Sequence, residues 1–253
     1  PDSQLPSSSS LVSETPSDTN NNSDLSQGTA SSESGDSSHE TSLDENTFNP
    51  SAIKIGLYNG VGIWDLNVKA FENYFNSRGY ILNEIDQTNL LDPEILAKFD
   101  LIWFPGGYSA EYKYLISATG QNNLRNYVEN GGHMAGSCAG AYFAAEIMTW
   151  YGEDSIYPLK IFSGKAVGPL AGMVPWGGVS VCTINKDIYG EKYNEYENKL
   201  QINYFDGPYF VPMQNSDIEI LVRYEVNNEA AVISGTYGNG RFLLFGPHPE
   251  LGT

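Results

Sequence analysis

Hydrophobic positions between residues 53 and 137 follow two alternating spacings. Four short apolar runs have the length of buried strands, and they lie at 53–58, 80–85, 101–104 and 133–137. After the first run, apolar residues recur every three or four positions, as on one face of a helix. These residues are Leu66, Ala70, Phe71, Tyr74 and Phe75. A chain that alternates strands with helices in this way predicts a mainly parallel sheet with helices on both faces.

Local signals indicate where the helices of this half begin and end. Gly79 follows the first helical set and is a typical stop. Asp92-Pro93-Glu94 begins a short helix, because Asp caps the amino end and Pro fits the first turn. A further helix includes 124–128 and ends at Gly131-Gly132, and another is expected over 141–150.

The second half of the chain has short alternating strands between Gly, Pro and Asn turns. The predicted strands are 161–167, 179–184, 200–204, 218–224, 230–234 and 241–245. Tyr237-Gly238-Asn239-Gly240, just before the last of them, is a strong hairpin signal. We therefore expect one α/β domain over residues 51–253, in which this half adds an antiparallel β extension and the returning edge of the main sheet.

Residues 1–50 have the composition of a disordered acidic tail. They contain no Lys or Arg, one aromatic residue (Phe48) and nine acidic residues, which are half of the net charge of −18. Such a segment cannot bury enough apolar surface to offset its chain entropy. A solvated linker is the simpler interpretation. The alternative is a spacer that tethers an exported domain to a surface.

Two features of this tail bear on export. Asn21-Asn22-Ser23 fits a glycosylation acceptor, although a tail rich in Asn and Ser produces such matches by chance. The chain begins at Pro1 rather than Met, so we expect that an upstream piece has been removed, for which a signal peptide is one candidate. The sequence leaves the physiological location open.

Composition excludes several classes of partner. A strongly acidic chain does not suit nucleic-acid backbones or anionic lipid, and no apolar run reaches the roughly 18 residues of a membrane span. The two cysteines, Cys138 and Cys182, are too few for a disulfide framework. No Cys/His cluster has zinc spacing and no phosphate-loop motif occurs, so we expect neither a metal nor a cofactor.

The main chemical signal is Gly136-Ser137-Cys138-Ala139-Gly140, between a predicted strand and a predicted helix. This context is typical of a nucleophile elbow, where small residues allow a sharp turn. The amino end of the following helix would stabilise the reactive thiolate. The alternative is that Cys138 is a small buried hydrophobic residue at the end of a strand.

A second signal, Gly246-Pro247-His248-Pro249-Glu250, follows the apolar run 242–245. If this strand is a parallel neighbour of the strand before Cys138, both ends open at the same edge of the sheet. His248 could then accept the Cys138 proton, and Glu250 could hold the imidazole in the required tautomer. The alternative is a histidine in a surface turn with a solvated carboxylate.

A third signal is Phe104-Pro105-Gly106-Gly107-Tyr108, after the run 101–104. Its glycines let backbone N–H groups approach a ligand, so Gly107 and Ala139 are candidates for an oxyanion hole. An ordinary loop is the alternative. Gly106, Tyr108 and Tyr142 are candidates for the substrate pocket. The remaining aromatic candidates for its walls are Tyr112 and Trp176.

The other histidines and the second cysteine carry weaker signals. His39 lies in the tail and has no expected role. His133 lies in the strand that leads to the elbow, where a core histidine is the simpler interpretation. Cys182 lies in an alternating strand and is expected in the core.

These loops, in this order, resemble class I glutamine amidotransferase-like domains, and among them the biotin-protein-ligase N-terminal-like family. The segments that carry the likeness are 58–62, 104–107, 136–144, 204–210 and 246–250. The resemblance implies a flavodoxin-like fold and a catalytic triad of Cys138, His248 and Glu250. It does not imply biotin ligation, because the ligase and biotin-binding parts of full-length relatives lie outside this kind of domain.

One position departs from the pattern of the glutamine-using members. They usually carry Gln four residues after the nucleophile, where this chain has Tyr142. Hydrolysis of glutamine is therefore not the expected reaction. Two functions remain: a cysteine-dependent hydrolase acting on an amide or acyl bond of a small-molecule or peptide-like substrate, and a non-catalytic binding or regulatory domain that retains the pocket. A scaffold role ranks third, and the sequence leaves the oligomeric state open.

Overall fold

The computed structural model describes residues 48–170, 178–184, 199–213 and 217–251. Most of the predicted tail, including His39 and the glycosylation motif, lies outside the described residues, as does Trp176. The side chain of Cys182 also lies outside this description. Among the described residues, no helix is long and apolar enough to cross a membrane.

Five parallel strands form one part of the sheet, of which the first four come from the first half of the chain and the fifth comes from its last part. They are β1 (Lys54–Tyr58), β2 (Ile81–Ile85), β3 (Leu101–Phe104), β4 (His133–Ser137) and β13 (Gly240–Phe245). Their order is β2-β1-β3-β4-β13, with parallel pairing throughout. The strand that ends before His248 is therefore the direct parallel neighbour of the strand that ends before Cys138.

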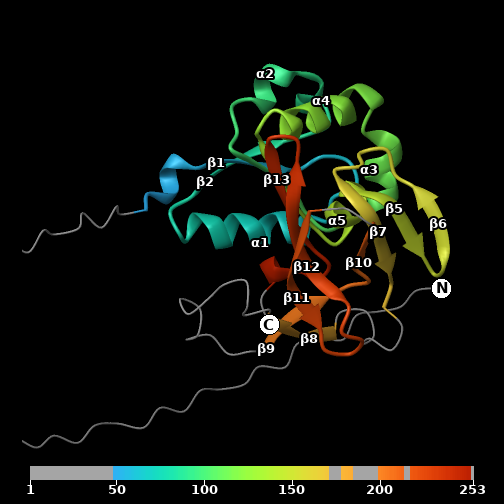
Figure 1. The fold of residues 1–253 in the computed structure, drawn as a ribbon. Helices are drawn as coiled ribbons and strands as arrows, with labels where there is room; N and C mark the ends of the chain where they lie inside the picture. Colours follow the sequence, from blue (N-terminus) through green and yellow to red (C-terminus); the bar gives the residue numbers. More distant parts are fainter. Residues whose placement is uncertain (1–47, 171–177, 185–198, 214–216, 252–253) are drawn as a thin grey trace, which may run out of the picture. The chain divides into compact units, whose positions relative to one another are not determined.

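Helices cover both faces of this parallel sheet (Figure 1). Helix α1 (Asp65–Asn76) packs on one face, where the rings of Phe71 and Trp103 lie 4.7 Å apart. The other helices are α2 (Pro93–Leu96), α3 (Ser109–Leu115), α4 (Ala118–Glu129) and α5 (Ala139–Ala144). They enclose a second cluster around Phe104 and Phe143. Because side chains alternate along a strand, neighbouring positions of β3 supply both cores.

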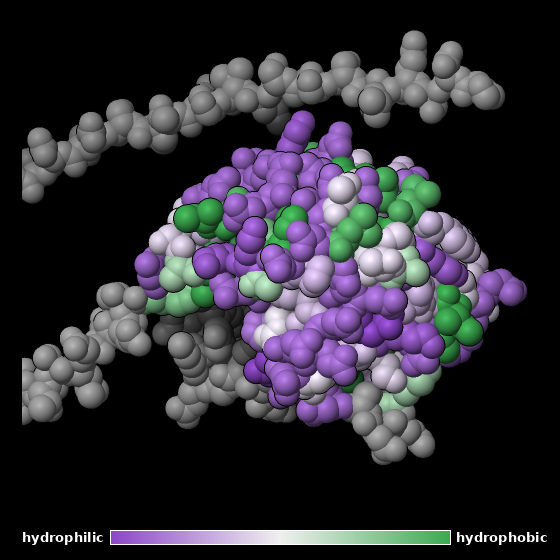
Figure 2. Space-filling model, turned by 90° about the horizontal axis from the view of Figure 1, so that it is seen from above, coloured by the Kyte–Doolittle hydropathy of each residue, from purple (hydrophilic) through white to green (hydrophobic). Residues whose placement is uncertain are grey.

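The buried face of α1 differs from the apolar spacing that predicted the helix. Leu66 and Tyr74 are exposed, whereas Asn67 is buried together with Val68 and Phe71. A polar residue thus occupies the stripe that faces the sheet. From above, the side that carries α2 and α4 is mainly hydrophilic with small separate apolar patches (Figure 2), as expected for the outer faces of amphipathic helices.

The second half of the chain extends the sheet beyond β13. The continuing strands are β12 (Ala230–Tyr237), β10 (Tyr209–Pro212), β7 (Phe162–Gly168), β5 (Ala145–Trp150) and β6 (Glu153–Ile156). A branch leaves β12 through β11 (Ile218–Tyr224), β8 (Gly178–Ile184) and β9 (Lys199–Tyr204). Pairing is antiparallel except between β5 and β7, which are parallel.

Three sequence expectations about this extension are settled by the pairing. The hairpin at Gly238-Asn239 is confirmed, because β12 and β13 pair with Tyr237 opposite Gly240. The expectation that the returning strand forms an edge is wrong, because β13 lies between β4 and β12. The helix expected over 141–150 is also wrong beyond Ala144, since residues 145–150 pair with β6 and β7 as a strand.

Local sequence explains why this last helix is short. Thr149 and Trp150 favour strands over helices, and a partner strand on each side satisfies their backbone groups. His133 is a further correction: it is exposed rather than in the core, and its Nδ1 accepts a hydrogen bond from the Arg241 N–H at 3.3 Å.

Candidate active site

Cys138 lies at the sharp turn between β4 and α5, as the elbow motif predicts. Its φ is 49° and its ψ is −104°, a conformation that non-glycine residues rarely adopt. The flanking glycines permit the turn: a Cβ on Gly140 would collide with the Phe104 carbonyl oxygen, and one on Gly136 would lie 2.7 Å from the Gly140 carbonyl carbon. Cys138 is 6% exposed, so only a small part of the residue reaches solvent.

The loop after β13 brings His248 and Glu250 to the same edge of the sheet. The Cys138 N–H donates to the Phe245 carbonyl oxygen at 2.9 Å, which ties the elbow to the end of β13. His248 is 1% exposed, and its backbone N–H donates to the Asn203 carbonyl oxygen at 2.8 Å. Its Nδ1 lies 2.8 Å from Glu250 Oε1, with both side chains buried.

Electrostatics favour a charged His248 in this position. Burial lowers the pKa of His248, but the Cys138 anion and hydrogen bonds to Cys138 and Glu250 outweigh burial and raise the pKa to about 10. When Cys138 is a neutral thiol, its Sγ donates to the Phe205 carbonyl oxygen at 3.4 Å. In that state His248 Nε2 has no hydrogen-bond partner among the described residues. Nε2 is thus the imidazole nitrogen that its partner Glu250, bonded to Nδ1, leaves free.

Gly106 lies beneath the imidazole and does not line the cavity beside Cys138. A Cβ at this position would collide with His248 Cε1 and with Asn67 Nδ2. Asn67 is 0% exposed, and neither polar atom of its side chain has a partner among the described residues. Sequence reasoning missed Asn67, although its place four residues before Phe71 on the sheet-facing stripe was a usable signal.

Gly107 and Ala139, the predicted oxyanion-hole residues, line a cavity together with Cys138 and His248. The Gly140 N–H donates to the Pro105 carbonyl oxygen at 3.2 Å, which connects the elbow to the Pro-Gly-Gly loop. The two backbone segments that contain Gly107 and Ala139 therefore border the same cavity as Cys138.

The cavity has a volume of about 560 Å³, within the range of small-molecule sites. Two of the pocket candidates, Tyr108 and Tyr142, line it. Tyr112 does not: it is fully buried in the core, and its hydroxyl donates to the Pro105 carbonyl oxygen at 3.1 Å. Trp64 and Phe205 complete the wall near His248, with ring centroids 5.2 Å apart.

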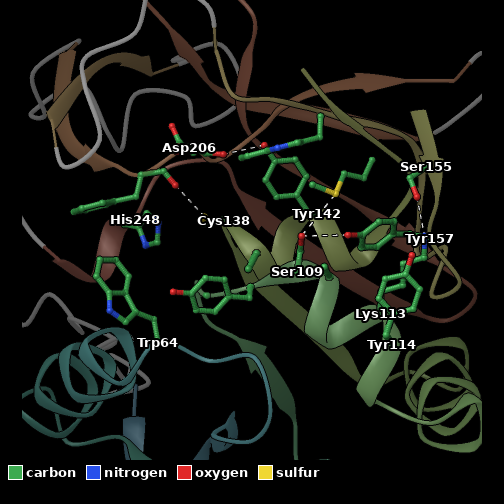
Figure 3. A pocket seen from close by; sticks show the side chains of 17 residues that line it. Trp64, Ser109, Lys113, Tyr114, Cys138, Tyr142, Ser155, Tyr157, Asp206 and His248 are labelled. Carbon is green, nitrogen blue, oxygen red and sulfur yellow. Dashed lines mark hydrogen bonds between the residues drawn. The ribbon is translucent and has the colours of Figure 1, made fainter. Parts of the chain in front are cut away.

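Tyr142 uses its polar group within the protein. Its hydroxyl donates to the Asp206 carbonyl oxygen at 2.9 Å, and burial raises its pKa well above the usual value. The far end of the cavity contains Lys113, Ser155 and Tyr157, which the sequence did not suggest (Figure 3). Within the described part of the chain, no cluster of three metal-ligating side chains occurs.

This fold, with Cys138 in the turn after β4 and His248 in the loop after β13 at one sheet edge, is that of the class I glutamine amidotransferase-like proteins. A solved structure described as a glutamine amidotransferase superposes with a TM-score of 0.58 and 18% identity, over 78% of this chain and 90% of that one. At this identity the likeness concerns the fold alone.

The sequence assigns the family within that class. Residues 53–253 match the family described as "Biotin-protein ligase, N terminal", and the chain belongs to it. A Chlamydia muridarum protein described as uncharacterized is 26% identical over 160 residues, 59% of this chain and 60% of that protein. A biotin–protein ligase of Schizosaccharomyces pombe is 26% identical over 184 residues, 68% of this chain. The chain spans 28% of that ligase's length.

Proposed function

We propose that this domain is a cysteine-dependent hydrolase or acyltransferase that acts on an amide or related acyl bond. The observation that supports the proposal best is the buried His248–Glu250 pair, 2.8 Å apart, at the sheet edge that also presents Cys138 in a left-handed elbow. Strained backbone and a buried ionisable pair are costly, and they are frequent where chemistry requires them.

In this mechanism the Cys138 thiolate attacks the carbonyl carbon and forms a C–S bond. The N–H groups of Gly107 and Ala139 would stabilise the negative oxygen of the tetrahedral intermediate. His248, oriented by Glu250, gives its proton to the leaving nitrogen or oxygen as the bond between that atom and the carbonyl carbon breaks. Water, or another nucleophile, then gives a proton to His248 and attacks the thioester carbonyl; the C–S bond breaks, the acyl group is released, and the Cys138 thiolate and protonated His248 are restored.

Glutamine is not the substrate that this cavity favours. Glutamine-using proteins usually carry Gln four residues after the nucleophile; here that position is Tyr142, whose hydroxyl is already bonded to the Asp206 carbonyl oxygen. Aromatic side chains rather than polar groups form much of the wall. The proposal does not include biotin ligation, because the chain spans only 28% of the length of the matched ligase.

A second candidate function is a non-catalytic binding or regulatory domain. The hydrogen bond from the Cys138 thiol to the Phe205 carbonyl oxygen favours this alternative, because a thiol that keeps its proton is not the reactive form of cysteine. The two candidates differ in the state of Cys138 near neutral pH. A catalytic cysteine is largely a thiolate there, whereas a free cysteine, with a pKa of about 8.5, is ionised to only about 3% at pH 7.

Alkylation by iodoacetamide distinguishes the two functions. We expect Cys138 in the folded protein to react at pH 7 at least about tenfold faster than in the urea-denatured protein, and His248→Ala to remove the difference. Cys182→Ser leaves Cys138 as the single cysteine and so makes the measurement specific. Reaction of Cys138 no faster than the denatured control would favour the binding domain. If Cys138 does react faster, a substrate screen that compares the unaltered protein with Cys138→Ser would identify the bond that is cleaved.

A further inference from the structure

The cavity beside Cys138 continues well beyond the nucleophile, and its two ends differ in chemistry (Figure 3). Cys138, His248 and Trp64 lie at one end. Lys113 lies at the other, with Ser155 and Tyr157. A cavity of about 560 Å³ can hold a ligand that reaches both ends.

The walls between the two ends favour an apolar or aromatic ligand. Tyr108 is 60% exposed, Tyr114 is 72% exposed and Trp150 is 37% exposed, and all three line the cavity. Large aromatic side chains left in water around one hollow gain free energy when a ligand covers them. Met148 adds an adaptable apolar side chain to the same wall.

Lys113 adds a positive charge at the far end. Its Nζ donates to Ser155 Oγ at 2.7 Å and lies 4.8 Å from the centre of the Tyr157 ring. Among the described residues, no carboxylate forms an ion pair with it. Lys160 and Lys165, by contrast, pair with Glu146 and Asp154. The hydrogen bond and the ring therefore fix the ammonium group but leave its charge uncompensated.

We infer that the substrate has an elongated apolar or aromatic body that ends in a carboxylate, and that Lys113 binds this carboxylate while the scissile carbonyl lies at Cys138. The inference rests on the proposed cysteine chemistry and adds the class of substrate to it. The only other charged side chains that line the cavity among the described residues are Asp206 and His248 (Figure 3). The cavity thus presents its uncompensated cation at the end away from the nucleophile.

A matched set of alkylating probes tests this inference. Each probe is a chloroacetamide whose nitrogen carries the same arylalkyl body, ending in a carboxylate, a primary carboxamide or an ammonium group. The Cys138 thiolate displaces chloride, and intact-mass spectrometry gives the second-order rate. We expect the carboxylate probe to react roughly tenfold faster than the carboxamide, because a hydrogen bond to a charged group adds about 1.5 kcal/mol. The ammonium probe should be the slowest.

Two lysine variants show where the preference originates. Lys113→Met removes the charge but keeps the length, and it should reduce the carboxylate preference to about twofold or less. Lys98→Met, at an exposed lysine that does not line the cavity, should keep the full preference. Iodoacetamide, which has no end group, should react with both variants at the unchanged rate. A preference that survives in Lys113→Met, or an equal rate with the carboxamide probe in the unaltered protein, overturns the inference.

Binding without reaction separates this inference from the proposed function. The acetamide analogues of the same probes have no chloride to be displaced and therefore cannot alkylate the protein. Their binding to the Cys138→Ser protein is measured by calorimetric titration. Tighter binding of the carboxylate analogue that Lys113→Met abolishes supports the inference even where Cys138 proves unreactive and the hydrolase proposal fails. Equal binding of all three analogues refutes the inference and leaves the hydrolase proposal untouched.

Discussion

Gly106 offers the most direct test of the link between the Pro-Gly-Gly loop and His248. A Cβ at Gly106 would collide with His248 Cε1 and Asn67 Nδ2. The backbone of Gly106 is not in the left-handed region, so Gly106→Ala perturbs the site through this contact alone. His248 is 1% exposed and bonded to Glu250, and Asn67 is fully buried. Neither neighbour can move aside freely.

The size of the effect follows from these contacts. Forcing a methyl group into a packed interior costs about 1–3 kcal/mol in the free energy of unfolding. If the imidazole is displaced from Cys138, the thiolate fraction at pH 7 falls toward the roughly 3% of a free cysteine. We therefore expect Gly106→Ala to slow iodoacetamide alkylation of Cys138 by about tenfold or more, and urea denaturation to show the loss of stability.

Gly79→Ala is the matched control for a general loss of stability. Gly79 follows α1 with φ of 78°, so alanine there costs about 1–2 kcal/mol through backbone strain. This variant should lose stability and keep the alkylation rate of the unaltered protein. If Gly106→Ala alkylates at the unaltered rate, or if both variants slow the reaction equally, the argument that Gly106 positions His248 is wrong.

Three further outcomes follow from the site. Glu250→Gln should lower the pKa of His248, measured by NMR titration of the imidazole, and slow the alkylation of Cys138 at pH 7, because the charged partner of Nδ1 is lost. Since the pKa of His248 is raised from 6.5 to about 10 in the folded protein, its stabilisation is complete below pH 6.5 and is lost as the pH rises through 10. Urea titrations should show the free energy of unfolding falling over this window by at most about 1.4 kcal/mol per pH unit, and falling less in Cys138→Ala. Tyr142→Phe should cost about 1 kcal/mol in thermal or urea denaturation by removing the 2.9 Å hydrogen bond to the Asp206 carbonyl oxygen; a variant as stable as the parent would contradict this.

Patterns within short segments predicted much of the sheet correctly. The apolar runs correspond to β1, β2, β3 and β4 within one residue at each end, and the Gly238-Asn239 turn joins the predicted hairpin. These features depend on side-chain alternation and turn chemistry, which a few neighbouring residues encode. The helix expected over 141–150 failed for the opposite reason, because partners distant in the sequence hold residues 145–150 as a strand.

The sequence by itself identified Cys138, His248 and Glu250 as chemically suited to act as nucleophile, base and orienting carboxylate. It could do so because the two motifs that contain these residues follow apolar strand segments and include glycine, which a sharp turn requires. Only the tertiary structure decided their surroundings. Pairing of β4 with β13 sets the edge on which they meet, and interactions with Cys138 and Glu250 raise the pKa of His248 against the effect of burial. Folding of distant segments brings Asn67 and His248 together beside Gly106 and Lys113 to the far end of the cavity. Long-range packing carries this information, and no local pattern of hydrophobic and polar residues can encode it.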